Sequence, residues 1–201
     1  MRPATALRIV VHALCAVPLA WLVFDTARGA LGPDPVAALT HRSGDWALRL
    51  LLLALAVTPV RRALRRPELV QLRRPLGLWA FTYATTHFSI WLLDMQGFWT
   101  QILADIAKRP FITVGFTAWL LLVPLAVTST RGMMRRLGRR WVQLHRLVYL
   151  IGALGVLHFI WGVKSGEKIA RIEPVVYALI LGLLLIARLP LARWWRRRAE
   201  G

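Results

Sequence analysis

The sequence predicts an all-α integral membrane protein, a bundle of six transmembrane helices with both termini in the cytoplasm. Three observations support this prediction. The 201 residues are 57% hydrophobic with a mean hydropathy of +0.53, which is more apolar than a soluble domain of this length. The apolar residues form runs long enough to cross a bilayer. The net charge of +18 comes from arginines bunched between those runs, which argues for a membrane topology and against nucleic-acid binding.

The first three predicted helices span residues 9–24, 46–60 and 76–93. A cleavable signal peptide is the alternative for the first, but residues 25–30 are a poor small-residue cleavage site, which favours a retained helix. Residues 25–45 are expected to form a turn-rich loop. The second helix should end near Pro59, and Pro75 suits the first turn of the third.

The last three predicted helices span residues 111–127, 141–163 and 174–189. The connections alternate in charge along the chain. Loops 25–45, 94–110 and 164–173 carry both signs, whereas the other connections and the C-terminal tail are rich in arginine. Because basic segments stay in the cytoplasm, the mixed loops are expected on the opposite side of the membrane.

A single domain, residues 1–201, is expected. Cys15 is the only cysteine, which excludes an internal disulfide and covalent c-type haem attachment. We find no glycine-rich nucleotide-binding motif and no convincing internal repeat.

Three histidines, His87, His145 and His158, fall inside apolar runs. Ionisable groups in hydrocarbon are costly and tend to mark functional sites. One such histidine could simply bond a neighbouring helix, but three in so small a protein suggest haem iron held between helices. His12 is interpreted as structural and His41 as solvated.

Distance from the basic loops estimates the depth of each histidine. His87 lies roughly 20 Å beyond Arg74, whereas His145 and His158 lie roughly 8 Å and 27 Å beyond Arg140, at 1.5 Å per residue. His87 is therefore expected to pair with His158 in the outer half of the membrane. His145 and His158 are about 140° apart on an ideal helix, so His145 belongs near the cytoplasmic face, beside a second haem or another redox group, or has a structural role.

Arginines near these histidines could bind anionic cofactor groups, since guanidinium binds them bidentately. Arg146 adjoins His145, and Arg73, Arg74, Arg139 and Arg140 could hold a flavin phosphate at the cytoplasmic surface. Arg49, inside the second predicted helix, is interpreted as reaching the nearest interface.

Several segments together resemble one family. They are Arg73-Arg74-Pro75-Leu76-Gly77-Leu78 before His87, Lys108-Arg109-Pro110-Phe111-Ile112-Thr113, Thr128-Ser129-Thr130, Leu137-Gly138-Arg139-Arg140-Trp141-Val142-Gln143-Leu144-His145, and His158-Phe159-Ile160-Trp161-Gly162-Val163-Lys164. In this order they resemble MsrQ, the haem-binding membrane subunit of the bacterial protein-methionine-sulfoxide reductase system. More distantly, the chain is similar to the ferric reductase and NADPH oxidase membrane domain. That larger family usually has two histidines on each of two helices, but Gln101 stands fourteen residues beyond His87, so the number of haems stays open.

The resemblance implies an electron-transfer subunit of the bacterial inner membrane that binds haem b, either one or two, together with FMN. Electrons would come from a cytoplasmic flavin reductase or from quinol. They would pass to a periplasmic molybdopterin-containing methionine sulfoxide reductase, which repairs oxidised envelope proteins. The partner would dock on the outer loops, where Phe98, Trp99 and residues 164–173 are candidates.

Two other functions remain open. One is a ferric or quinone reductase-like cytochrome b that acts alone. The other is a transporter that uses the histidines to relay protons. An absorbance spectrum would distinguish a transporter from a cytochrome, because a transporter would be colourless.

Overall fold

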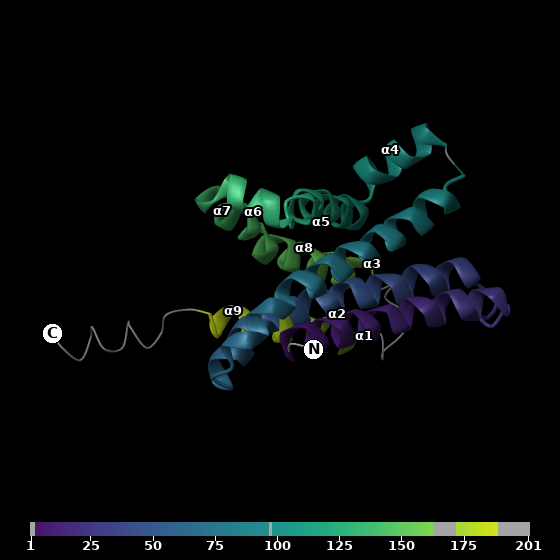
Figure 1. Cartoon of the computed structure of the whole chain (residues 1–201). Coiled ribbons are helices and arrows are strands. Elements are labelled where there is room, and N and C mark those ends of the chain that lie inside the picture. Colours follow the sequence, from purple (N-terminus) through teal and green to yellow (C-terminus); the bar gives the residue numbers. More distant parts are fainter. Residues whose placement is uncertain (1–2, 97, 163–171, 189–201) are drawn as a thin grey trace.

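The structure is a computed structural model that describes residues 3–96, 98–162 and 172–188. Within these residues every regular element is a helix, so the all-α fold is confirmed (Figure 1). In chain order the helices are α1 (Pro3–Ala27), α2 (Pro35–Ala63), the 3-10 helix η1 (Pro67–Leu72), α3 (Arg73–Asp94), α4 (Trp99–Lys108), α5 (Pro110–Val127), α6 (Arg131–Leu137), α7 (Arg139–His145), α8 (Leu147–Gly162) and α9 (Ile172–Ile186).

Four stretches of the described chain are long and apolar enough to cross a membrane: Thr5–Ala27, Pro35–Ala63, Pro110–Val127 and Arg139–Gly162. Helix α9 is also apolar but has 15 residues. Large apolar side chains on the outer faces of the helices, such as Trp21 and Leu183, are more than 60% exposed. Such faces are suited to lipid, so the protein is a multi-pass membrane protein.

Two antiparallel helix pairs form the centre of the bundle. Helix α2 packs along α3, and α5 packs along α8, while α1 lies against α3 and α9 lies against α8 and α2. Tyr83 of α3 is fully buried between α1 and α2, and its hydroxyl donates to the carbonyl oxygen of Cys15 at 2.8 Å. This bond ties α1 to the core as an integral helix of the bundle.

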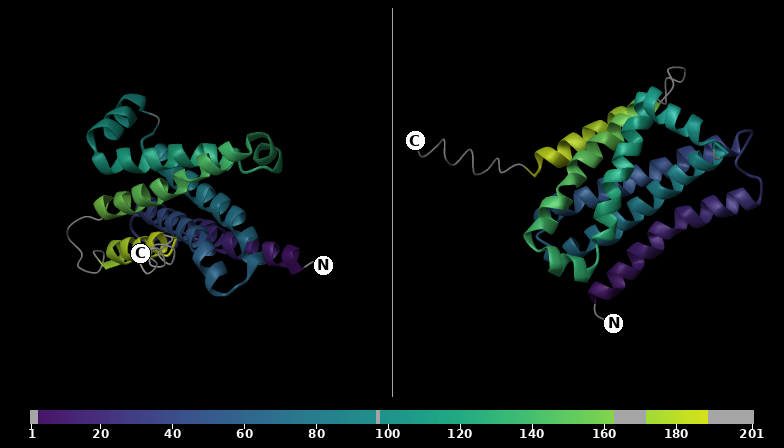
Figure 2. Two further views of the ribbon diagram at one scale, coloured as in Figure 1. Left: turned by 90° about the vertical axis from the view of Figure 1, so that its left-hand side faces the viewer. Right: turned by 90° about the horizontal axis from the view of Figure 1, so that it is seen from above.

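The arginine-rich connections gather at one end of the bundle. Figures 1 and 2 show η1, α6, α7 and the start of α1 toward one end, and the α1–α2 turn and α4 toward the other. We name these the basic end and the α4 end. The charge separation on which the sequence-based topology depends is therefore present in the folded chain.

The expected loop 25–45 is wrong from residue 35 onward. Helix α2 begins at Pro35, which suits a first helical position, and the Asp34 side chain caps it by accepting from the amide of Ala37 at 2.9 Å. The expectation of an irregular loop at 94–110 is wrong in the same way. Amphipathic helix α4 occupies most of it and buries Ile102.

The fifth predicted helix, 141–163, is divided. Helix α7 ends at His145, and α8 begins at Leu147. Around Arg146 the amides bond three residues back, Arg146 to Gln143 at 3.2 Å and Tyr149 to Arg146 at 3.1 Å, which tightens the turn and breaks the α-helical repeat. Its predicted last residue, the end of the sixth helix at 189 and most of loop 164–173 lie outside the described residues.

Candidate functional site

His87 of α3 and His158 of α8 face each other across the bundle. Their ring centroids are 6.0 Å apart, with the ring planes at 78°. Helices α3 and α8 belong to different helix pairs, so this contact joins the two halves of the bundle. The structure therefore brings together two of the three histidines that the sequence singled out.

Each of these imidazoles is held by a backbone carbonyl. Nδ1 of His87 lies 2.8 Å from the carbonyl oxygen of Thr40, and Nδ1 of His158 lies 2.7 Å from that of Phe111. Because a carbonyl oxygen only accepts, Nδ1 carries the proton and donates in both cases. Nε2 of each ring then keeps its lone pair, which is the usual state of a histidine that ligates a metal.

Two glycines give these rings their space. A Cβ atom at Gly44 would lie 3.0 Å from Nδ1 of His87, and one at Gly115 would lie 2.6 Å from Nδ1 of His158. Any larger residue at 115 would therefore push His158 out of place. Each glycine stands one helical turn after the residue that provides the carbonyl.

The α2–α3 and α5–α8 pairs repeat one arrangement. In both pairs 47 residues separate the residue with the accepting carbonyl from its histidine. The repetition extends to the basic end, where a hydroxyl side chain stands fourteen residues after each glycine. Thr58 accepts from Arg73 in the first pair, and Ser129 contacts His145 in the second. Arg73 thus contacts the hydroxyl side chain in the first pair as His145 does in the second, and the two pairs form a structural repeat that sequence inspection missed.

The two imidazoles have the separation that a shared iron ion requires. With metal–imidazole bonds of about 2 Å on each side, as for zinc, two rings that share one ion have centroids roughly 6 Å apart. The two free Nε2 atoms, the Nδ1–H bonds that fix ring orientation and the glycine contacts therefore fit a haem with two histidine ligands.

His145 lies near the other end of the bundle. Its Nε2 is 3.4 Å from the Ser129 hydroxyl, its Nδ1 is 3.0 Å from the carbonyl oxygen of Trp141, and its ring stacks on Trp141 at 3.8 Å. His158 contacts Phe111 in the first turn of α5, whereas His145 contacts Ser129, two residues after α5 ends. These contact points are eighteen residues apart, roughly 27 Å at 1.5 Å per residue.

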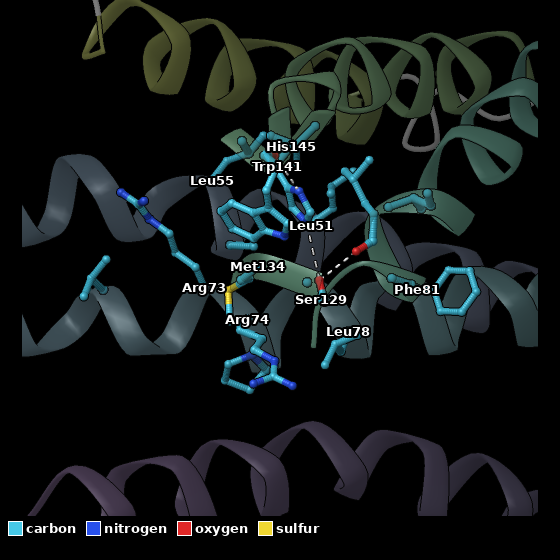
Figure 3. A pocket seen from close by; sticks show the side chains of 18 of the residues that line it. Leu51, Leu55, Arg73, Arg74, Leu78, Phe81, Ser129, Met134, Trp141 and His145 are labelled. Atoms are coloured by element: carbon cyan, nitrogen blue, oxygen red, sulfur yellow. Dashed lines mark hydrogen bonds between the residues drawn. The ribbon is translucent and has the colours of Figure 1, made fainter. Parts of the chain in front are cut away.

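His145 lines a cavity of about 900 Å³ between the helix pairs (Figure 3). Apolar side chains of α2, α3 and α5, including Leu51, Leu55 and Phe81, form much of its wall. Six arginines also line it, and no Asp or Glu of the described chain does; they are Arg8, Arg73, Arg74, Arg131, Arg146 and Arg188. An apolar cavity with this charge is suited to a planar anionic ligand.

Of the sequence-predicted arginines, Arg73, Arg74 and Arg146 line this cavity, but Arg139 and Arg140 are not among its lining residues. The Nε of Arg49 donates to the Tyr177 hydroxyl at 2.8 Å, and its Nη2 lies 3.9 Å from Asp45.

Sequence reasoning did not select Arg188, and it gave His12 a structural role only. Both line the cavity, and the Trp79 indole donates to Nδ1 of His12 at 2.9 Å. No sequence spacing connects these residues with His145, because α1, the end of α7 and the residues after α9 come together only in the fold.

Comparisons with known proteins agree with this geometry. Residues 43–156 match the family model of the ferric reductase like transmembrane component. A relative from Xanthomonas campestris pv. campestris, named protein-methionine-sulfoxide reductase heme-binding subunit MsrQ, is 54% identical over 90% of this chain and 84% of its own length. A relative of the same name from Herminiimonas arsenicoxydans is 42% identical over 98% of this chain and 89% of its own. No solved structure matches the chain significantly.

Proposed function

Because the chain belongs to the ferric reductase-like transmembrane family and, within it, to the MsrQ haem-binding subunits of protein-methionine-sulfoxide reductases, we propose that it carries electrons across the bacterial inner membrane. The electrons pass through haem b to a periplasmic molybdopterin-containing methionine sulfoxide reductase, which repairs oxidised envelope proteins. Within the membrane this chain is the electron-transfer subunit, and the substrate chemistry belongs to the partner.

The facing pair His87 and His158 is the observation that supports this proposal most strongly. In it, Nε2 of each ring would ligate the iron of one haem, and the Thr40 and Phe111 carbonyls fix the rings through Nδ1. A bound haem supplies a one-electron change between ferric and ferrous iron. Because the ligands come from different helix pairs, each held by its own partner helix, the packing of the bundle sets their separation in both oxidation states.

The cavity beside His145 is the proposed inner site, for a second haem or for FMN. Of the described residues, His145 and His12 are the histidines that line it, and in the other helix pair Arg73 makes the hydroxyl contact that His145 makes here. Arg73, Arg74 and Arg146 would bind the propionates or the phosphate through charge-assisted hydrogen bonds. The inner and outer sites then lie at opposite ends of α5, as a path across a membrane requires.

The proposed topology follows the positive-inside rule. Residues 1–201 form one domain with six membrane helices, and the basic end and both termini face the cytoplasm. Electrons from a flavin reductase or from quinol enter at the basic end and leave near α4. Phe98 and Trp99, which are 55% and 69% exposed, stand at the α4 end as candidates for docking the partner.

A reduced-minus-oxidised absorbance spectrum of the purified protein, with haem quantified per chain, tests the proposal. A b-type spectrum with one haem per chain would assign that haem to His87 and His158, and two would place the second beside His145. A colourless protein would contradict the redox function and return the histidines to proton relay or packing. Turnover with soluble acceptors in the absence of any periplasmic partner would favour a reductase that acts alone.

A further inference from the structure

Three arginines from separate parts of the chain lie close together at the basic end. Arg61 belongs to the last turn of α2, Arg73 begins α3, and Arg188 follows α9. Nε of Arg61 and Nε of Arg188 are both buried and have no hydrogen-bond partner within the described chain. A buried charged donor without a partner is costly, which indicates that a group is missing here.

No carboxylate of the described chain forms an ion pair with this cluster. The ion pairs of the described chain involve Arg42, Arg49, Arg66 and Arg109, and none includes a member of the cluster. Burial lowers the pKa of the Arg73 guanidinium, and the charges of Arg188 and Arg61 lower it further. Like charges held together at partly buried positions repel each other unless an anion lies between them.

Arg188 and Arg73 are held in place by neutral groups. Arg188 donates from Nη1 to the Tyr149 hydroxyl at 2.7 Å and from Nη2 to the carbonyl oxygen of Leu55, and its guanidinium lies 5.1 Å from the Tyr149 ring centroid. Arg73 donates from Nη2 to Thr58. These bonds use part of each guanidinium and neutralise none of its charge, so the remaining donors are positioned for an acidic ligand.

We propose that Arg61, Arg73 and Arg188 bind the phosphate group of a phosphate ester, whose apolar part enters the cavity beside His145. A phosphate ester supplies several acceptor oxygens and one or two negative charges, which matches three guanidinium groups. Arg73 and Arg188 also line the cavity, so the same ligand can reach both regions. Two sources carry this chemistry, FMN and an anionic phospholipid of the inner leaflet, and choosing FMN rests on the proposed electron-transfer function.

The test uses the full chain in lipid nanodiscs, with the variants Arg61→Gln and Arg188→Gln. Arg135→Gln is the matched control, because it removes the same charge from an exposed position of α6. FMN binding is measured by flavin fluorescence, with riboflavin as the phosphate-free ligand. Phosphatidylglycerol retained through purification is counted by native mass spectrometry. The haem spectrum reports separately whether the redox site is intact.

About tenfold weaker FMN binding in both variants, with unchanged riboflavin binding and an unchanged Arg135→Gln control, would assign the site to the flavin phosphate. Loss of a stoichiometric phosphatidylglycerol with unchanged FMN binding would assign it to lipid. Unchanged binding of both ligands would overturn the proposal, as would an effect confined to haem content, which would assign the arginines to haem propionates. A normal haem spectrum beside unchanged FMN and lipid binding would reject the phosphate site alone and leave the electron-transfer function intact.

Discussion

His158 lies directly against Gly115, so that a Cβ atom at position 115 would come within 2.6 Å of its Nδ1. The contact holds the ring where its Nδ1 donates a hydrogen bond to the Phe111 carbonyl oxygen at 2.7 Å. Gly44 and His87 repeat the relationship in the other helix pair with a slightly longer contact of 3.0 Å. The absence of a side chain at Gly115 and Gly44 therefore leaves the space that His158 and His87 occupy.

Gly115→Ala should displace His158 and lower the haem content of the purified protein. A real Cβ would meet the ring itself, and the ring cannot retreat without losing its bond to Phe111. The Soret absorbance per chain measures the effect, and Gly44→Ala should produce a smaller loss. Gly182→Ala of α9, where an added Cβ meets nothing within 4 Å, is the control. Equal haem content in Gly115→Ala and Gly182→Ala would contradict this assignment.

His87→Ala and His158→Ala should remove the same haem signal. Because each ring lies 6.0 Å from the other and keeps Nε2 free of the Nδ1 bond, losing either one would leave the iron a single histidine ligand. Electron paramagnetic resonance of the oxidised protein checks this, since the low-spin signal of a haem with two histidine ligands should vanish in both variants. His145→Ala should spare that signal, and the pairing is wrong if His145→Ala removes it too.

Tyr83→Phe should destabilise the protein by about 1 kcal/mol without affecting the haem. Tyr83 is fully buried, and its hydroxyl provides a bond of 2.8 Å from α3 to the Cys15 carbonyl of α1. Losing one buried hydrogen bond costs roughly this amount. Thermal unfolding in detergent provides the measurement, and the haem spectrum shows whether the redox site is intact. No destabilisation would mean that α1 is not tied to the bundle through this residue.

The sequence predicted the fold well where long apolar runs and charge determine structure. Predicted helices 76–93 and 111–127 agree closely with α3 and α5, because proline and arginine mark where these helices start. The beginning of α2 was also readable in principle, since Asp34-Pro35 is a capping sequence that the turn signal of Gly32-Pro33 obscured. Helix α4 was missed because a ten-residue amphipathic helix has too few apolar residues to resemble a membrane span.

Tertiary relationships could not be predicted from the sequence in the same way. The depth estimate led to the pair His87 and His158, whose ring centroids lie 6.0 Å apart, but nothing in the local sequence connects His87 with Gly44 or His158 with Gly115. The sequence comparison placed the missing fourth histidine after His87, at the position of Gln101. In the repeated helix pairs, it is Arg73, before His87, that makes the hydroxyl contact corresponding to that of His145.

Single cysteines at the two ends of the bundle should report opposite sides of the membrane. Thr100→Cys lies on α4, and Arg135→Cys lies on α6 at the basic end, and both positions are exposed. The native Cys15 is buried and is replaced by alanine as background. A membrane-impermeant maleimide should label Thr100→Cys in cells whose outer membrane alone is permeabilised. It should reach Arg135→Cys only after the inner membrane is broken.

This labelling pattern follows from the cost of moving many arginines across a bilayer. Eleven arginines between residues 61 and 140 lie in the basic connections, and the α4 end carries both signs of charge. Labelling of Arg135→Cys in cells with an intact inner membrane would invert the topology. It would place His145 and its arginine-lined cavity on the outer side, where a cytoplasmic flavin or its reductase could not reach them, and the proposed direction of electron flow would then be untenable.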